Sequence, residues 1–146
     1  MNKIFINLCL LVTAVFALSG QAQETVKFPT VDIKVKHKAL HVEYANTHEL
    51  RAQGLMKRTE LCADCGMLFK FDSPRRASMW MMNTYIPLDV AFIRSDGVIT
   101  DIRAMQPQDL TSIGASQEVL YALEMNQGWF QSQGIVVGDK LNLGSK

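Results

Sequence analysis

Two apolar runs, residues 88–94 and 98–104, are separated only by Ser95-Asp96-Gly97. Glycine supplies the positive φ angle that a tight turn between antiparallel strands requires. The stretch therefore predicts a β-hairpin. It constrains the fold strongly, because a hairpin contributes two neighbouring antiparallel strands to a sheet.

Similar patterns elsewhere predict a domain built mainly from short strands. Alternating or continuous apolar segments predict further strands over residues 31–36, 40–44, 66–71, 77–82, 119–125 and 140–143. Thr47 is suited to cap a helix that ends near Gly54, and Gly134 is suited to end a second helix over residues 127–133. Residues 106–116 are expected to form a polar loop. The sequence thus predicts a single α+β domain, mainly antiparallel β, with a closed or sandwiched sheet and about two short helices.

The N-terminus has the parts of a secretory signal peptide. Lys3 provides positive charge, residues 4–18 are mostly apolar, and Gly20-Gln21-Ala22 is suited to cleavage, with Ala17-Leu18-Ser19 as a second choice. The apolar run is shorter than the about 20 residues that span a bilayer, so an uncleaved anchor is the less favoured alternative. We expect a signal peptide over residues 1–22 and a periplasmic or secreted protein with no membrane span after cleavage.

The charge distribution argues against a nucleic-acid partner. The formal net charge is only +1, and it includes Lys3 of the predicted signal peptide. Lys34, Lys36 and Lys38 alternate along the chain, which predicts one solvated face of a sheet. No basic helix or interleaved aromatic residues accompany them, so the sequence predicts that the protein does not bind nucleic acid.

Several motifs, in order along the chain, resemble a known family. They are Gly54-Leu-Met, Gly66-Met-Leu-Phe-Lys-Phe, Met79-Trp-Met-Met-Asn-Thr-Tyr-Ile-Pro-Leu-Asp, the Asp96-Gly97 turn, Tyr121-Ala-Leu-Glu-Met-Asn-Gln-Gly and Gly138-Asp139. Over residues 36–143 the chain resembles the DUF192 family, also called UPF0127, and residues 23–35 would be a leader and first strand. The resemblance implies a compact β-rich fold with short helices, often behind a signal peptide. It implies no established activity.

Cys62 and Cys65 form a C-x-x-C pair just before a predicted strand. In an oxidising compartment the favoured interpretation is a structural disulfide. A redox couple is an alternative, but no helix follows the pair to lower a thiol pKa. Metal binding is a further alternative, although it would have to recruit a distant His37, His41 or His48.

Methionine is abundant in the predicted exported chain, which contains Met56, Met67, Met79, Met81, Met82, Met105 and Met125. Thioethers suit Cu(I), but methionine more often fills irregular cores. In the predicted strand, Met79 and Met81 share one face, while Trp80 and Met82 share the other. This alternation would divide a methionine cluster, so we expect core packing and no metal site.

A polar set lies within otherwise apolar segments and also matches the family motifs: Asn83, Thr84, Asp89, Glu124 and Asn126. One interpretation is structural, with Asn126 capping the following helix and the others satisfying backbone groups. The other is a ligand-binding pocket that these residues line together with Trp80 and Met82. In either case, we expect Trp80, Asn83, Asp89 and Glu124 to share one neighbourhood.

Arginines surround the predicted early helix at positions Arg51, Arg58, Arg75 and Arg76. We expect them to be solvated or paired with Glu60 or Asp72, with an anionic ligand as the alternative. No histidine, serine nucleophile motif or phosphate-binding loop accompanies the carboxylates, so no catalytic residue and no cofactor are predicted. The favoured function is non-enzymatic binding of an unknown small molecule or envelope protein. The alternatives are a thiol-disulfide or copper-handling protein and a purely structural interaction domain.

Overall fold

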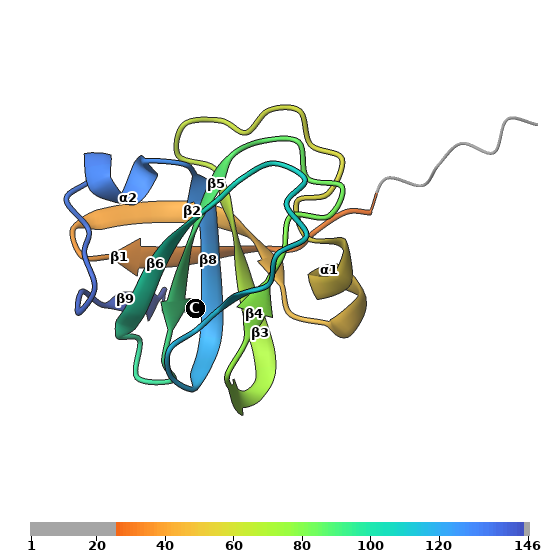
Figure 1. The fold of residues 1–146 in the computed structure, drawn as a ribbon. Helices are drawn as coiled ribbons and strands as arrows, with labels where there is room; N and C mark the ends of the chain where they lie inside the picture. The colour runs from red at the N-terminus through yellow and green to blue at the C-terminus, as the bar shows by residue number, and fades with distance from the viewer. Residues whose placement is uncertain (1–25, 145–146) are drawn as a thin grey trace, which may run out of the picture.

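The computed structural model describes residues 26–144, which form a curled seven-stranded sheet, a small two-stranded sheet and two short helices (Figure 1). The strands are β1 Thr30–Val35, β2 Lys38–Ala45, β3 Gly66–Arg75, β4 Ser78–Met79, β5 Leu88–Ile93, β6 Ile99–Met105, β7 Ile113–Gly114, β8 Val119–Asn126 and β9 Leu141–Leu143. The helices are α1 His48–Gln53 and α2 Trp129–Ser132. The predicted α+β class is confirmed. The predicted signal peptide lies outside the described residues.

The main sheet has seven strands in the order β6-β5-β8-β3-β2-β1-β9. Neighbours are antiparallel except β2 and β3, which are parallel and are joined through α1. Beyond the named strands, Val98 pairs with Lys140, and the Leu141 N–H donates to the Gly97 carbonyl over 2.8 Å. Backbone hydrogen bonds therefore link the β6 and β9 ends, so the sheet curls back on itself and these edges are partly protected.

The predicted hairpin is confirmed as β5 and β6 with a turn at residues 94–98. The Arg94 N–H donates to the Val98 carbonyl over 3.0 Å, and Gly97 adopts φ 84°. All six residues of β5 are buried, because both faces of the sheet carry apolar clusters. Burying a large apolar side chain contributes about 1.5–3 kcal/mol, so this central strand is strongly anchored.

The two apolar clusters lie on opposite faces of β3, β5 and β8. The α1-side cluster includes Met67 and Phe69 of β3 and Val90 of β5. The α2-side cluster includes Leu68 of β3 and Ala91 of β5, together with Trp129 and Phe130 of α2. Because successive side chains of a strand point to opposite faces, each position is committed to one cluster.

The predicted strand over residues 77–82 is wrong for most of its length. Only Ser78–Met79 is extended, and it pairs with β7 inside the predicted polar loop. The chain then turns, because the Met81 N–H donates to the Asp109 carbonyl and the Thr84 N–H to the Met81 carbonyl, over 2.9 and 3.1 Å. Met79 and Met81 nevertheless pack against the same α1-side cluster, while Trp80 between them is exposed.

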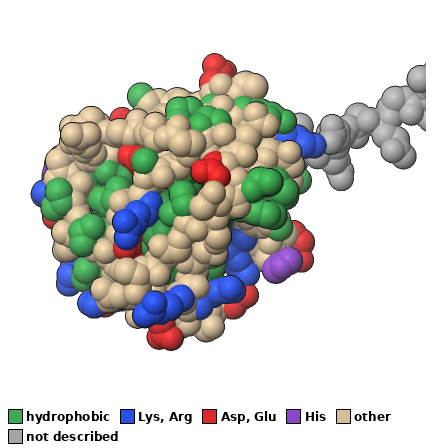
Figure 2. Space-filling view, in the orientation of Figure 1, with side chains coloured by type: hydrophobic (Ala, Val, Ile, Leu, Met, Phe, Trp, Pro, Cys, Tyr) green, Lys and Arg blue, Asp and Glu red, His purple; other side chains and the backbone are tan. Residues whose placement is uncertain are grey.

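Within residues 26–144, no helix is long and apolar enough to cross a membrane. Side chains of both charge signs are spread over the face shown in Figure 2, with apolar patches between them. Two of the three alternating lysines are paired: Lys36 lies 3.2 Å from Asp139, and Lys38 lies 2.9 Å from Asp64.

Candidate functional site

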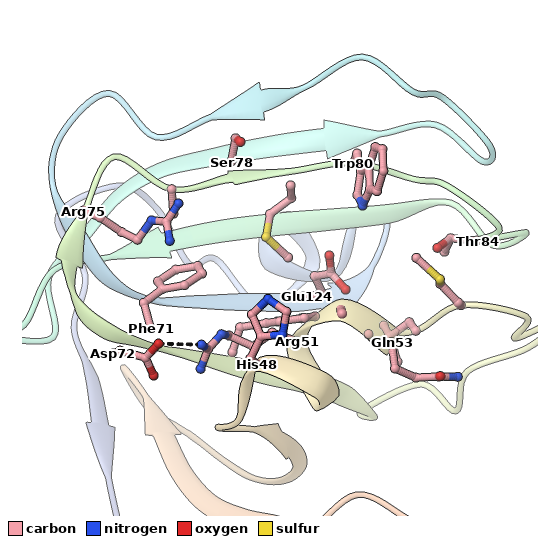
Figure 3. Close-up of a pocket in the computed structure, with 17 residues that line it drawn as sticks. His48, Arg51, Gln53, Phe71, Asp72, Arg75, Ser78, Trp80, Thr84 and Glu124 are labelled. Atoms are coloured by element: carbon pink, nitrogen blue, oxygen red, sulfur yellow. Dashed lines mark hydrogen bonds and ion pairs between the residues drawn. The ribbon is translucent and has the colours of Figure 1, made fainter. Parts of the chain in front are cut away.

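A cavity of about 290 Å³ opens between α1, the outer half of β3 and the segment around β4, with β8 behind it (Figure 3). The following residues line it: His48, Arg51, Ala52, Gln53, Gly54, Leu55, Met56, Phe69, Phe71, Asp72, Arg75, Ala77, Ser78, Met79, Trp80, Thr84 and Glu124. Three of the sequence-predicted site residues, Trp80, Thr84 and Glu124, are therefore brought together. We refer to this space as the α1 cavity.

Local interactions fix α1 at the edge of the cavity. The Thr47 hydroxyl accepts the Leu50 N–H over 3.3 Å, which confirms the predicted N-cap. Arg51 then ties the helix to β3, since its guanidinium donates to the Lys70 carbonyl and to Asp72, each over 2.8 Å. Asp72 is thus the partner of Arg51, whereas Arg58 pairs with Glu43 rather than with the predicted Glu60.

Aromatic and sulfur-containing side chains form much of the cavity wall. Phe69 and Phe71 come from β3, while Met79 and Trp80 come from β4 and the residue after it. Trp80 is 51% exposed, which is unusual for so large an apolar side chain. The Arg75 guanidinium lies 5.9 Å from the centroid of the Phe71 ring, in the range of a cation–π contact.

Glu124 lies at the base of the α1 cavity. It is only 4% exposed, and burial raises the pKa of its carboxyl to about 8. No donor or charge in the described part of the chain opposes this effect. Every side-chain oxygen among the described residues is either hydrogen-bonded or at least partly open to solvent. Because the Glu124 carboxyl has no hydrogen bond, its oxygens are open to the cavity. A buried carboxyl without a protein partner is costly and marks the cavity base as a binding position.

Thr84 lines the cavity, but its neighbour Asn83 does not. The Thr84 hydroxyl donates to the Met82 carbonyl over 3.3 Å. Asn83 has φ 54°, and its carbonyl accepts the Lys57 N–H over 2.7 Å, so it shapes the turn. Met82 also lies outside the cavity lining.

Asp89 lies on the other face of the sheet, and the predicted shared neighbourhood of Asp89 and Glu124 is wrong. In the β5–β8 register, Asp89 stands opposite Met125, while Glu124 stands opposite Val90. Cross-strand partners share a face, so the two carboxyls point to opposite sides. Asp89 accepts the Gly128 N–H over 2.8 Å and supports the start of α2. Burial raises its pKa, and this hydrogen bond opposes the rise.

Asn126 does not cap α2 as predicted. Its side-chain amide donates to the carbonyls of Leu61 and Cys62 over 3.2 and 2.9 Å. Cys62 and Cys65 form a disulfide in this loop, and the Trp129 indole N–H donates to Asp64 over 3.0 Å. Asn126 and Trp129 therefore hold the disulfide loop against the end of β8.

A second hollow, of about 550 Å³, lies beside the disulfide loop and is lined in part by His41, Glu43 and Arg58. Its principal charges are mutually paired, because Arg58 contacts Glu43 over 2.7 Å. Among residues 26–144, no group of three or more histidine, cysteine or acidic side chains is placed to hold a metal ion. The α1 cavity is the better candidate, since the buried carboxyl at its base has no partner among residues 26–144.

The sequence interpretation missed the aromatic wall of the α1 cavity. The sequence predicts Phe69 and Phe71 as ordinary strand positions, and only their approach to α1 places them at a cavity. Arg51 and Arg75 were noted as candidates for an anionic ligand. No periodic signal in the sequence indicates that one of them is paired and the other is not.

The chain matches the family model of DUF192, described as "Uncharacterized ACR", over residues 30–143. The chain belongs to the DUF192 family. A crystal structure of a candidate transcription regulator from Sinorhizobium meliloti 1021 is 37% identical, with a TM-score of 0.78, over 82% of this chain and 97% of that one.

A second crystal structure, that of a protein of unknown function from Novosphingobium aromaticivorans DSM 12444, is 36% identical with a TM-score of 0.74. The match covers 77% of this chain and 84% of that one. No curated protein matches the sequence. The family and fold are thereby shown, while the family itself carries no assigned activity.

Proposed function

We propose that this DUF192 protein is an exported, non-enzymatic binding domain that holds a small molecule in the α1 cavity. The observation that carries this proposal is the buried carboxyl of Glu124, which has no partner among the described residues and reaches open cavity space. Apolar walls with a few polar groups are typical of ligand sites, and the α1 cavity combines them.

Export is supported by the N-terminal pattern and by the disulfide between Cys62 and Cys65. The intact mass of the protein recovered from the cell envelope or medium tests it. A chain that begins at Gln23 is expected. A mass that includes Met1 would contradict cleavage.

Ligand binding is tested by an NMR titration of the purified protein with a set of small acids, amines, alcohols and amides. Shifts are expected at α1, β3 and the indole of Trp80. The matched control is Ala52→Trp, because Ala52 is exposed yet lines the cavity, so the larger side chain fills the space without disturbing the core. Shifts that persist in this variant, or none with any compound, would contradict the proposal.

A thiol-disulfide or copper-handling role has weaker support. The disulfide loop is anchored by Asn126 and Trp129, and β3 rather than a helix follows it. Thiol counting without reductant should find no free thiol in the exported protein. Turnover of a disulfide substrate, or Cu(I) binding lost on replacing both cysteines by serine, would favour this alternative instead.

The likeness to a candidate transcription regulator does not lead us to propose nucleic-acid binding. Lys36 and Lys38 are paired with carboxylates, which reduces the positive potential of the β1–β2 surface. The candidate ligand of the α1 cavity is therefore a small molecule.

A further inference from the structure

We propose that the ligand of the α1 cavity is a small zwitterion, with an ammonium group at Glu124, an anionic group at Arg75 and an apolar segment between them. This inference rests on the proposed binding function and adds a chemical class to it. It follows from the charged groups that line the cavity and from how each is already paired.

The titratable and charged side chains facing the cavity come from three elements. His48 and Arg51 belong to α1, Asp72 and Arg75 to β3, and Glu124 to β8. Arg51 and Asp72 form an ion pair with each other over 2.8 Å, so they largely cancel. One carboxyl, Glu124, and one guanidinium, Arg75, are left without an ionic partner within residues 26–144.

These two groups lie in different parts of the cavity. Glu124 projects from β8 at the buried base, whereas Arg75 is exposed at the end of β3 (Figure 3). A ligand that satisfies both must carry its positive group inward and its negative group toward solvent. The wall between α1 and β4 carries Phe69, Phe71 and Met79, so an apolar middle of such a ligand would find apolar contacts there.

The wall also favours a cation at the base. Phe69, Phe71 and Trp80 contribute aromatic rings, whose faces attract cations. Arg75 already lies over the Phe71 ring, which shows that this surface accepts a positive charge. An ammonium that reaches Glu124 would be paired with a carboxylate in surroundings of low polarity, where such a pair is strong when it is well hydrogen-bonded.

Ligand binding should change the protonation state of the Glu124 carboxyl. When the cavity is empty, burial keeps the carboxyl protonated up to a pKa of about 8. An entering ammonium favours the carboxylate, so binding releases the carboxyl proton to solvent. The affinity for an ammonium ligand should therefore rise from pH 6 to pH 8, by up to about tenfold per pH unit.

The proposal is tested with three probes of matched length: 6-aminohexanoate, hexylamine and hexanoate. We expect the purified protein to bind 6-aminohexanoate most tightly, hexylamine next and hexanoate least, as measured by NMR titration. A comparison of 4-aminobutanoate with 8-aminooctanoate then reports the span between the two charged groups. His48→Gln, which removes the exposed imidazole that lines the cavity, is measured in parallel over the same pH series.

Two variants test the two ends of the ligand separately. Glu124→Gln should weaken 6-aminohexanoate and hexylamine by at least about tenfold, while hexanoate changes little. Arg75→Gln should weaken 6-aminohexanoate by about threefold, as expected for an exposed ion pair, and leave hexylamine unchanged. Glu118→Gln and Arg76→Gln are the matched controls, because both residues are exposed and lie outside the cavity lining.

The outcomes distinguish this inference from the proposed function. If hexanoate binds the α1 cavity as tightly as 6-aminohexanoate, the zwitterion class is wrong and small-molecule binding stands. If none of the amine or amino-acid probes binds, the zwitterion class is again overturned, and the broader compound set decides whether the cavity binds anything. An affinity for 6-aminohexanoate that falls from pH 6 to pH 8 would also overturn it.

Discussion

Asp101 and Glu124 are both buried carboxyl groups of this protein, at 5% and 4% exposure, yet their surroundings differ completely. Asp101 accepts hydrogen bonds from the Ser116 N–H and hydroxyl over 3.0 and 2.8 Å and from the Thr100 hydroxyl over 2.9 Å. Arg103 adds an ion pair over 3.0 Å. Burial raises the Asp101 pKa, but these donors outweigh it and the net shift is downward.

Glu124 has no such donors, so burial alone determines its pKa. The comparison indicates that burial by itself does not identify a functional acid. The hydrogen-bond partners of a buried carboxyl decide whether it is part of the scaffold or remains available to a ligand. Asp89 is intermediate, because it has one backbone donor and a pKa that is still raised.

The largest expected effect is on the pH dependence of stability in Glu124→Gln. Burial raises the folded-state pKa of Glu124 to about 8, from an ordinary value of 4.5. Between these values the unfolded chain ionises while the folded protein keeps the proton, so the wild-type protein loses stability as the pH rises. Glutamine cannot ionise, and the variant should gain about 3 kcal/mol over wild type between pH 5 and pH 8.

Urea denaturation of both proteins across this pH range measures the difference. Glu118→Gln is the control, since Glu118 is exposed just before β8. A constant difference between Glu124→Gln and wild type at every pH would mean that Glu124 is not protonated in the folded protein. The contrast with Asp101 would then fail.

Asp101→Asn should show the opposite sign. The folded-state pKa of Asp101 lies below its ordinary value, so its contribution to stability is present above that value and is lost as the pH falls through the folded pKa. Replacing the carboxylate weakens its bonds to Ser116, Thr100 and Arg103. The variant should lose about 2 kcal/mol near pH 7, as expected for hydrogen bonds to a charged group.

Denaturation at pH 7 and at about pH 3 measures this change, and the difference from wild type should shrink at the lower pH. Arg103→Gln serves as a companion variant, because Arg103 is 54% exposed in its side chain and supplies only the ion pair. A loss as large in Arg103→Gln as in Asp101→Asn would mean that the ion pair, rather than the Ser116 and Thr100 donors, determines the Asp101 environment.

The sequence was sufficient for the strands of the main sheet and insufficient for the site. Gly97 and the apolar runs beside it define a hairpin locally, and the structure confirms it. The faces of Asp89 and Glu124 depend on the β5–β8 register, a non-local property. Because β5 is buried on both faces, its sequence shows no alternation that could reveal the register.

The small β4–β7 sheet escaped prediction for a related reason. Each of its strands has only two residues, too few for any periodic pattern. Its position depends on contacts with distant loop residues, such as the hydrogen bond between the Met81 N–H and the Asp109 carbonyl over 2.9 Å. Trp80 lines the α1 cavity, whereas the sequence does not indicate that α1 and β3 complete it.

The smallest expected effect concerns Asp89, and two variants are needed to resolve it. Asp89→Ala removes the acceptor of the Gly128 N–H and should cost about 1 kcal/mol. Asp89→Asn keeps an acceptor oxygen and removes the charge that burial disfavours. Since the Asp89 pKa is raised, ionised Asp89 lowers stability as the pH rises, so the asparagine variant should equal or exceed wild type at pH 7.

Chemical denaturation of both Asp89 variants at pH 7 gives the two free energies of unfolding. If alanine and asparagine behave alike, the hydrogen bond to Gly128 contributes nothing, and Asp89 would resemble Glu124 rather than Asp101. If alanine alone is destabilising, one backbone donor is enough to make a buried carboxyl part of the scaffold. Glu124 lies two positions before Asn126 in β8 and on the face of the sheet opposite Asp89. It would then be the buried acid that remains available to a ligand.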